Sequence, residues 1–353
     1  MNSSPMRKRS GIVRGQSIDM SHGSGGKAMR DLIEDIFVGS FDNDLLAPLE
    51  DQARIDLSLL TAQGNRLAFT TDSYVVHPIF FNGGDIGTLA INGTVNDLAV
   101  GGAIPLYLTC GMIIEEGLAV DDLRLIATSM KTAASKAGVK IVSGDTKVVE
   151  RGAADKIFIN TSGIGVIPAH INVGAGNAQA GDVVLINGHL GDHGAAIIGA
   201  RGDLALENNI ASDCCALNHL ISDLLKACPE VHCLRDATRG GVATVLNEFA
   251  RASEVCIKID EKALPIRAEV RGICEILGID PLYLANEGKL VAVVPATYAQ
   301  VALEAMRQNE AGKDSTIIAE IFAAPKETVI LKTIFGGERI VDMLVGDQLP
   351  RIC

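Results

Sequence analysis

The chain has 353 residues, which at roughly 150 residues per domain predicts about two domains. It carries 43 acidic side chains against 31 Lys and Arg, a net charge of −12, and this argues against proteins that coat nucleic acid or an anionic membrane, because both need a basic face. Hydrophobic residues make up 48% of the chain and charged residues 21%, so a substantial core is expected and global disorder is not.

Eight cysteines are scattered along the chain without a Cys-x-x-Cys pair, which is too sparse for a disulfide framework. Residues 1–19 are polar and basic and lack the apolar stretch of a signal peptide. The longest uncharged run, between Asp97 and Glu115, contains two adjacent glycines and Pro105, so it is interpreted as buried core and not as a membrane span. We therefore expect a cytoplasmic protein with reduced thiols.

In the first half of the chain, residues 1–20 are expected to form a flexible leader. Apolar spacing predicts helices over 27–37, 86–100 and 123–137, the last of them ended by Gly138. Strands are expected over 67–71, 107–114, 139–142 and 158–166. In this interpretation Asp72 ends the first strand, and Gly144 and Asp145 form a turn after the third.

A small, polar stretch over 168–181 marks the expected domain boundary. Beyond it, strands are predicted over 182–186 and 290–294, and helices over 211–227, 240–252 and 299–307. The alternation of strands and helices predicts an α/β (α+β) protein. We expect an N-terminal domain over 21–170, a C-terminal domain over 180–335, and a mobile tail over 336–353 that carries Cys353.

Three glycine-containing segments are candidates for phosphate binding. Residues 22–27 (HGSGGK) precede a helix, where backbone N–H groups and the helix N-terminus attract anions. The segment is not a Walker A loop, because Ala28 stands where Ser or Thr is required, and a flexible hinge is an equal alternative. Residues 144–147 (GDTK) and 235–241 (RDATRGG) combine charged side chains with Thr hydroxyls, or are simply charged turns.

Acidic residues recur beside turns, where several of them would come together on a magnesium ion. Mg²⁺ takes one or two carboxylates plus phosphate oxygens. Each Asp taken alone more often caps a helix or fills a turn, but the set together favours binding of a magnesium–nucleotide complex. Its members are Asp51, Asp72, Asp85, Asp97, Asp145 and Asp236. Glu287, between Asn286 and Gly288 ahead of an apolar run, is a candidate base or a residue of an ordinary turn.

Two further features involve cysteine. Residues 214–233 hold four Cys and two His, but their spacing is irregular for zinc, so buried thiols are favoured over a metal site. Cys353 is the last residue, which does not fit a prenylation signal, and its own carboxylate disfavours the thiolate. It is either incidental or a mobile covalent carrier.

Taken together, these motifs closely resemble the HypE family of hydrogenase maturation proteins, within the ATP-binding superfamily of aminoimidazole ribonucleotide (AIR) synthase. The resemblance extends from His22 to Cys353. It rests on residues 71–74 (TDSY), 80–87 (FFNGGDIG), 92–99 (NGTVNDLA), 114–117 (IEEG), 144–149 (GDTKVV), 235–241 (RDATRGG), 285–289 (ANEGK) and 350–353 (PRIC). The terminal PRIC distinguishes the HypE family from the rest of the superfamily. Asn82 departs from it, since Pro is expected there.

The resemblance implies a two-domain AIR synthase-like (PurM-like) fold whose N-terminal domains form a homodimer and which binds ATP and Mg²⁺ between domains. It further implies that Cys353 receives a carbamoyl group from a HypF-like carbamoyltransferase. ATP then drives dehydration of the S-carboxamide to a thiocyanate. The cyanide passes to iron on a HypC–HypD complex and becomes a ligand of the [NiFe] hydrogenase centre.

Residue roles follow from the same resemblance. The implied metal ligands are Asp51, Asp72, Asp97 and Asp236. The implied cofactor-binding residues are Lys27, Asp72, Asn92, Asp97, Gly144, Asp145, Thr146 and Asp236. The implied catalytic residues are Cys353 as covalent carrier, Glu287 as base, and Lys147 at the phosphate or the reacting group.

Two alternatives stay open. The first is another enzyme of the superfamily, such as selenophosphate synthetase, which typically has a Cys or selenocysteine beside the N-terminal glycine loop, whereas the first cysteine here is Cys110. The second is a non-catalytic metal-delivery or docking protein that uses the Cys and His residues of 214–233. It predicts stoichiometric metal binding and no ATP turnover.

Overall fold

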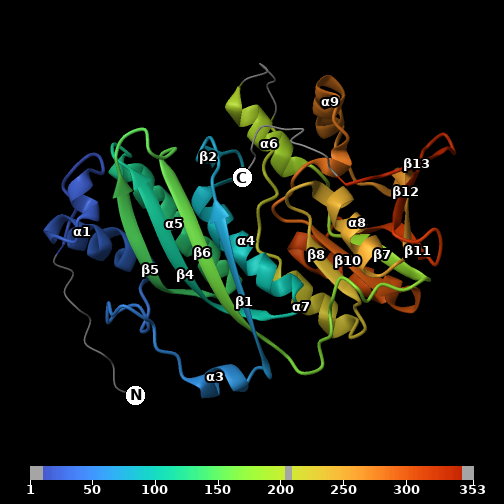
Figure 1. Ribbon diagram of the computed structural model, residues 1–353, viewed down its shortest axis with the longest axis horizontal. Coiled ribbons are helices and arrows are strands. Elements are labelled where there is room, and N and C mark those ends of the chain that lie inside the picture. Colours follow the sequence, from blue (N-terminus) through green and yellow to red (C-terminus); the bar gives the residue numbers. More distant parts are fainter. Residues whose placement is uncertain (1–10, 203–208, 344–353) are drawn as a thin grey trace.

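The computed structural model describes residues 11–202 and 209–343, so Cys353 lies outside the described residues. The two larger of the three β-sheets in these residues lie side by side, each with its own helices (Figure 1). None of the helices in the described ranges combines the length and apolarity that a membrane crossing requires.

The first sheet has the strand order β1-β6-β4-β5. Its strands are β1 (Arg66–Tyr74), β4 (Ile104–Glu115), β5 (Lys140–Val149) and β6 (Ile157–Ile167). Only β4 and β5 run parallel, and α5 (Val120–Ala137) makes the crossover between them. This helix ends at Gly138, whose φ of 74° is the left-handed conformation that glycine adopts readily.

One face of this sheet is covered by α4 (Ile86–Val100) and α5, as Figure 1 shows. The Asp85 carboxylate caps α4 by accepting the N–H of Thr88 at 2.8 Å. The opposite face leaves large apolar side chains exposed, with Leu67 at 64%, Phe69 at 72% and Ile113 at 43%. Because side chains alternate along β1, Asp72 and Tyr74 point to the helix-covered face.

The second sheet has the order β13-β12-β9-β11-β7-β10-β8. Its strands are β7 (Asp182–Ile186), β8 (Cys233–Asp236), β9 (Cys256–Asp260), β10 (Leu290–Pro295), β11 (Thr316–Phe322), β12 (Thr328–Lys332) and β13 (Glu338–Ile340). The longer helices of this half are α6 (Asp192–Arg201), α7 (Asn218–Ala227), α8 (Gly241–Ala252), α9 (Ala268–Leu277) and α10 (Ala299–Gln308). Alternate residues of β7 and β10 pack against α8 on one face and against α7 and α10 on the other.

Shorter elements complete the described chain. They are η1 (Met20–Gly23), α1 (Lys27–Leu32), the π-helical η2 (Ile33–Val38), α2 (Gly39–Phe41), α3 (Leu57–Thr61), β2 (Phe80–Phe81), β3 (Gly84–Asp85), η3 (Glu261–Ala263), η4 (Pro281–Tyr283), η5 (Ala296–Tyr298) and η6 (Glu310–Gly312). The first helical segments follow one another without a break from Lys27 to Phe41.

The predicted helix 86–100 and strand 182–186 are confirmed to the residue. Two predicted strand ends are wrong. Strand β1 continues past Asp72 to Tyr74, and β5 continues through residues 144–147, because each of these stretches pairs with a neighbouring strand for its whole length. The predicted helix 211–227 is also wrong in its first part: helix α7 begins only at Asn218, and the preceding residues lie against the first half, where they bond to Asn82 and Asn96.

Candidate functional site

A cavity of about 210 Å³ lies where the two halves meet. Its walls come from β1, α4, the end of β8 with the loop after it, and the turn before β10. The lining residues are Thr71, Asp72, Ser73, Tyr74, Gly93, Asp97, Asp236, Thr238, Arg239 and Glu287. The structure thus brings together four acidic residues that the sequence analysis singled out, from positions as far apart as 72 and 287.

Each half of the molecule supplies a pair of these acids. In the first half, Thr70 on β1 donates its hydroxyl to Asp97 Oδ2 at 3.1 Å, which ties α4 to the strand that carries Asp72. In the second half, Asp236 ends β8 and pairs in register with Leu290 of β10, so it lies beside the turn that holds Glu287. Arg239 reaches across, with Nη2 3.9 Å from Asp72 Oδ1.

Crowded acids shift one another's protonation in this cavity. Burial, and after it repulsion from Asp97, raises the pKa of Asp236 to about 7. Burial also raises the pKa of Asp97, and repulsion from Asp72 adds to this against the hydrogen bond from Thr70. The pKa of Tyr74 lies well above its usual value because the phenol is buried beside Asp72, so Tyr74 stays a neutral hydroxyl.

The chemistry of this donor set fits Mg²⁺, whose preferred ligands are oxygens, and a cation would relieve the repulsion between Asp97 and Asp236. Among the described residues, no three His, Cys, Asp or Glu side chains are arranged to hold an ion by themselves. Mg²⁺ does not require such a cage, because it keeps waters and takes phosphate oxygens alongside one or two carboxylates.

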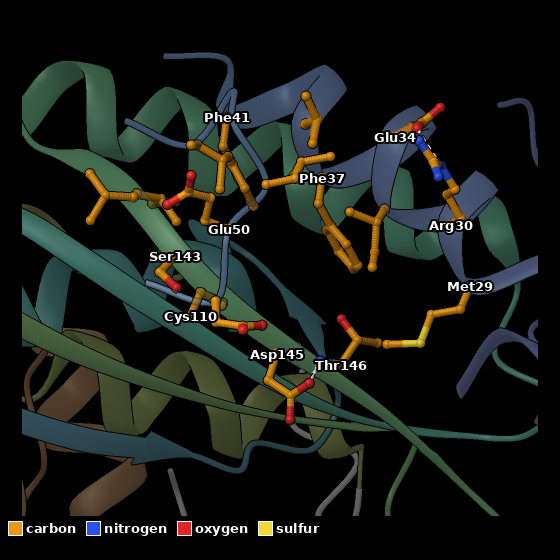
Figure 2. Close-up of a pocket in the computed structure, with 18 of the residues that line it drawn as sticks. Met29, Arg30, Glu34, Phe37, Phe41, Glu50, Cys110, Ser143, Asp145 and Thr146 are labelled. Atoms are coloured by element: carbon orange, nitrogen blue, oxygen red, sulfur yellow. Dashed lines mark hydrogen bonds and ion pairs between the residues drawn. The ribbon is translucent and has the colours of Figure 1, made fainter. Parts of the chain in front are cut away.

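A larger cavity of about 720 Å³ lies at the other edge of the first sheet, between β4, β5 and the N-terminal helices. Figure 2 shows Phe37 and Phe41 facing it from the helical side, with Cys110 and Thr146 on the strand side. Gly25, Gly26 and the run Ser143–Thr146 also line it, and so does Asp51. Apolar rings opposite a glycine-rich backbone suit a flat aromatic group that carries an anion.

The predicted site residues therefore divide between two cavities. Asp72, Asp97, Asp236 and Glu287 line the smaller one, whereas Asp51, Gly144, Asp145 and Thr146 line the larger one. The cavities lie at opposite edge strands, β1 and β5, which are three inter-strand steps or roughly 14 Å apart. Within one chain, the four proposed metal ligands do not meet.

Three more predicted site residues within the described ranges line neither cavity. Lys147 follows the wall of the larger cavity, and its Nζ lies 3.3 Å from Asp145 Oδ2, with both side chains mostly exposed. Lys27 is 86% exposed and pairs with Asp31 one turn further along α1. Asn92 is buried in α4 and donates to the Cys214 sulfur at 3.5 Å.

The sequence analysis missed Thr71, Ser73, Tyr74 and Gly93 as lining residues, and it named Thr238 and Arg239 only within a phosphate-binding segment. The alternation of β1 carried a signal for Tyr74, since residues 72 and 74 share a face. Gly93 is required by close approach: a Cβ there would lie 2.3 Å from the Tyr74 hydroxyl.

The described cysteines are unpaired, and all seven carry raised thiol pKa values because they are buried. For Cys110 and Cys233 the pKa reaches about 12. A thiol that stays protonated is a poor nucleophile. None of these seven side chains is therefore suited to carry a covalent intermediate.

Comparison with known proteins agrees with this architecture. Residues 49–167 match the family model of the AIR synthase related protein N-terminal domain, and residues 179–332 match that of the C-terminal domain. A carbamoyl dehydratase HypE from Rhodobacter capsulatus is 54% identical over 341 residues, which cover 97% of this chain and 99% of that protein.

Two solved structures extend the comparison. The crystal structure of a hydrogenase maturation protein HypE in complex with ATP superposes with a TM-score of 0.89 at 47% identity, covering 95% of this chain and 99% of that one. A HypE–HypF complex superposes with a TM-score of 0.76 at 50% identity, covering 89% and 99%. The motifs resemble those of the HypE family, both domain models match, and the identity to HypE proteins reaches 54%. The chain therefore belongs to the HypE family of AIR synthase-related proteins.

Proposed function

We propose that this protein is an ATP-dependent carbamoyl dehydratase that converts an S-carboxamide on Cys353 into a thiocyanate and so supplies the cyanide ligand of [NiFe] hydrogenase. The observation that carries the proposal is the cavity that unites Glu287 with Asp72, Asp97 and Asp236, in a chain 54% identical to a carbamoyl dehydratase. ATP as co-substrate is supported by the related protein solved with ATP.

The reaction defines what the residues must do. The carboxamide oxygen is a poor leaving group, so it attacks the γ-phosphorus of ATP and leaves as phosphate, with ADP as the other product. The nitrogen loses both of its protons as the C≡N bond forms. We assign Glu287, which is 5% exposed and lines the cavity, as the base that accepts one of them, while the departing phosphate takes the other.

The phosphoryl oxygens need positive charge beside them. We propose that Asp72, Asp97 and Asp236, with Asp51, hold Mg²⁺, which neutralises charge on the triphosphate when it is bound. Asn92 lies on the same helix as Asp97, five residues before it, and would support the same region. Arg239 and Lys147 would contact phosphate directly, and Gly144, Asp145 and Thr146 would hold the nucleotide at the larger cavity. Lys27, which follows the lining residues Gly25 and Gly26, would contact phosphate from outside the cavity.

A second copy of the chain would reconcile the two cavities. The exposed apolar face of the first sheet, with Leu67, Phe69 and Ile113, is suited to self-association. We propose a homodimer through this face, in which the Gly144–Lys147 edge of one copy completes a site of the other. Since the two edges are roughly 14 Å apart within one sheet, the Asp51 role in particular depends on this pairing.

The remaining partners follow the chemistry of Cys353. A HypF-like carbamoyltransferase would load it, as the related HypE–HypF complex supports, and a HypC–HypD complex would take the cyanide. We place the protein in the cytoplasm, where its unpaired thiols would stay reduced. With its net charge of −12, we expect no binding to nucleic acid or membrane.

The test follows the mass of the peptide that contains Cys353. Incubation with the carbamoyltransferase, carbamoyl phosphate and ATP should add one carbamoyl group, which then loses one water only when ATP–Mg²⁺ is available to this protein. Glu287→Gln should accumulate the carbamoyl form, and Cys353→Ala should acquire no adduct. Normal dehydration by Glu287→Gln would remove Glu287 from its role, and an adduct on another residue of Cys353→Ala would refute the proposal.

A further inference from the structure

The turn that carries Glu287 rests on a buried carboxylate from another part of the chain. Asp213 Oδ1 accepts the backbone N–H of Glu287 at 3.0 Å, and Asp213 Oδ2 accepts that of Gly288 at 3.2 Å. Lys289 Nζ lies 2.8 Å from Asp213 Oδ2, and the two side chains are only 9% and 5% exposed. Three consecutive residues of the turn thus bind one carboxylate.

We infer that Asp213 is a positioning residue for the dehydration step, which holds the turn over 286–289 so that Glu287 stays at the cavity shared by the two halves. The inference rests on the proposed function, because it assigns Asp213 a role through Glu287. Asp213 does not line the cavity and is not proposed to touch the substrate.

The opposite end of the turn is held independently. Asn286 Oδ1 accepts the N–H of Gly191 at 2.8 Å, and Asn286 Nδ2 donates to the carbonyl of Ala237, next to Asp236, at 2.9 Å. At Gly288 the two segments approach so closely that a Cβ would lie 2.0 Å from the Asp213 carbonyl oxygen. Asn286, Gly288 and Lys289 are therefore all committed to fixing the backbone from which the Glu287 side chain extends.

Asp213 can serve as this anchor because it remains an anion. Burial alone would raise its pKa, but Lys289 and the N–H donors outweigh burial and hold the pKa below its ordinary value. A charged acceptor forms stronger hydrogen bonds with backbone N–H groups than a neutral one. Asp213 therefore keeps its negative charge at neutral pH.

The segment that carries Asp213 is itself fixed to the first half. Asn96 of α4 donates to the carbonyls of Cys215 at 3.1 Å and of Glu287 at 3.5 Å, and accepts the N–H of Leu217 at 2.7 Å. Asn96 is 1% exposed and directly precedes Asp97. Through this contact Asp213 links the position of Glu287 to the helix that carries Asp97, so acids from both halves keep one geometry.

The experiment separates the two chemical steps in the full-length protein. Asp213→Asn keeps the shape of the side chain and removes its charge. It should leave carbamoylation of Cys353 and the KM for ATP within about twofold of wild type and lower the kcat of dehydration by about ten- to a hundredfold, as small misplacements of a catalytic group do. The matched control is Asp182→Asn, which removes another buried carboxylate, paired with His232 at 2.7 Å, and should dehydrate normally.

A double-mutant cycle tests whether Asp213 acts through Glu287. In a Glu287→Gln background, adding Asp213→Asn should cost almost nothing further, because the group that it positions is already gone. If Asp213→Asn fails to fold around an unpaired Lys289, Asp213→Asn/Lys289→Gln removes both charges and should still dehydrate slowly while accepting carbamoyl normally.

Three outcomes would overturn the inference: normal dehydration by folded Asp213→Asn, full additivity with Glu287→Gln, or parallel loss of carbamoylation and stability in both Asp213 variants. Failure of the wild-type protein to dehydrate carbamoylated Cys353 would instead refute the proposed function, and this is read from the wild-type sample alone.

Discussion

At the scale of single residues, two neighbouring buried groups differ in charge: Asp213 is an anion, and His193 is neutral. Asp213 is kept ionised by Lys289, whereas His193 is fully buried with Nδ1 2.9 Å from the Ser212 hydroxyl. Burial lowers the pKa of His193 to about 4, even though Asp213 acts in the opposite direction. Position and partner, more than residue type, thus decide protonation behind the Glu287 turn.

This difference predicts a pH dependence of stability. Below pH 6.5 the unfolded chain binds a proton at His193, whereas the native state does not bind it until about pH 4. The free energy of unfolding therefore falls as the pH drops through this window. Between pH 7 and pH 5 the contribution lost is about 2 kcal/mol. Urea unfolding of wild type and His193→Asn at pH 7 and pH 5 checks this. Between these pH values the free energy of unfolding of the variant should fall by about 2 kcal/mol less than that of wild type. Equal pH dependence of the two proteins would contradict it.

At the scale of elements, the first half depends on the close approach of α4 to α5. A Cβ on Gly87 would lie 2.7 Å from the Ile126 carbonyl oxygen and 2.8 Å from Met130 Cγ. Because α4 carries Asn92, Asn96 and Asp97, its distance from α5 also sets where these side chains lie. The packing of α4 against α5 and the geometry of the cavity are therefore linked.

We expect Gly87→Ala to destabilise the protein by about 1–3 kcal/mol through overpacking, although Ala is the better helix former by about 1 kcal/mol. The control is Gly272→Ala in α9, where a Cβ meets nothing within 4 Å, so only the gain in helix propensity remains. Urea unfolding compares the two variants, and their midpoints report stability as long as the m-values equal that of wild type. A Gly87→Ala protein as stable as wild type would show that α4 and α5 can separate without cost.

At the scale of the whole molecule, the exposed face of the first sheet predicts the assembly state. Phe69→Glu places a charge at the centre of the proposed homodimer interface and should yield monomers by analytical ultracentrifugation, with a loss of dehydration if both copies build each site. Ile276→Glu on α9, which replaces a side chain that is 64% exposed in the other half, should leave the assembly unchanged. A Phe69→Glu protein that sediments like wild type would place any interface elsewhere.

Local patterns were sufficient where one element determines the outcome. The apolar spacing of 86–100 and the glycine at position 138 predicted a helix and a helix end that the structure has, because both signals act within a few residues. They failed over 211–217, where apolar spacing resembles a helix. There the Asn96 side chain binds the backbone of Cys215 and Leu217, and the Asp213 carboxylate accepts the N–H of Glu287, so the segment takes another conformation. Contacts between residues so far apart in the sequence leave no periodic pattern of apolar residues.

The sequence by itself determined the α/β class, the family, and the residue types that the chemistry needs, since motifs and charge are local properties of the chain. Tertiary structure alone decided their grouping: Asp72, Asp97, Asp236 and Glu287 share one cavity, while Asp51 and Gly144–Thr146 line another. The physical reason is the strand order, which places β1 and β5 at opposite edges of one sheet and brings β8 and the turn before β10 against β1 and α4. The same packing brings the buried Asp213 carboxylate to the backbone N–H of Glu287, a contact that the spacing of residues along the chain does not predict.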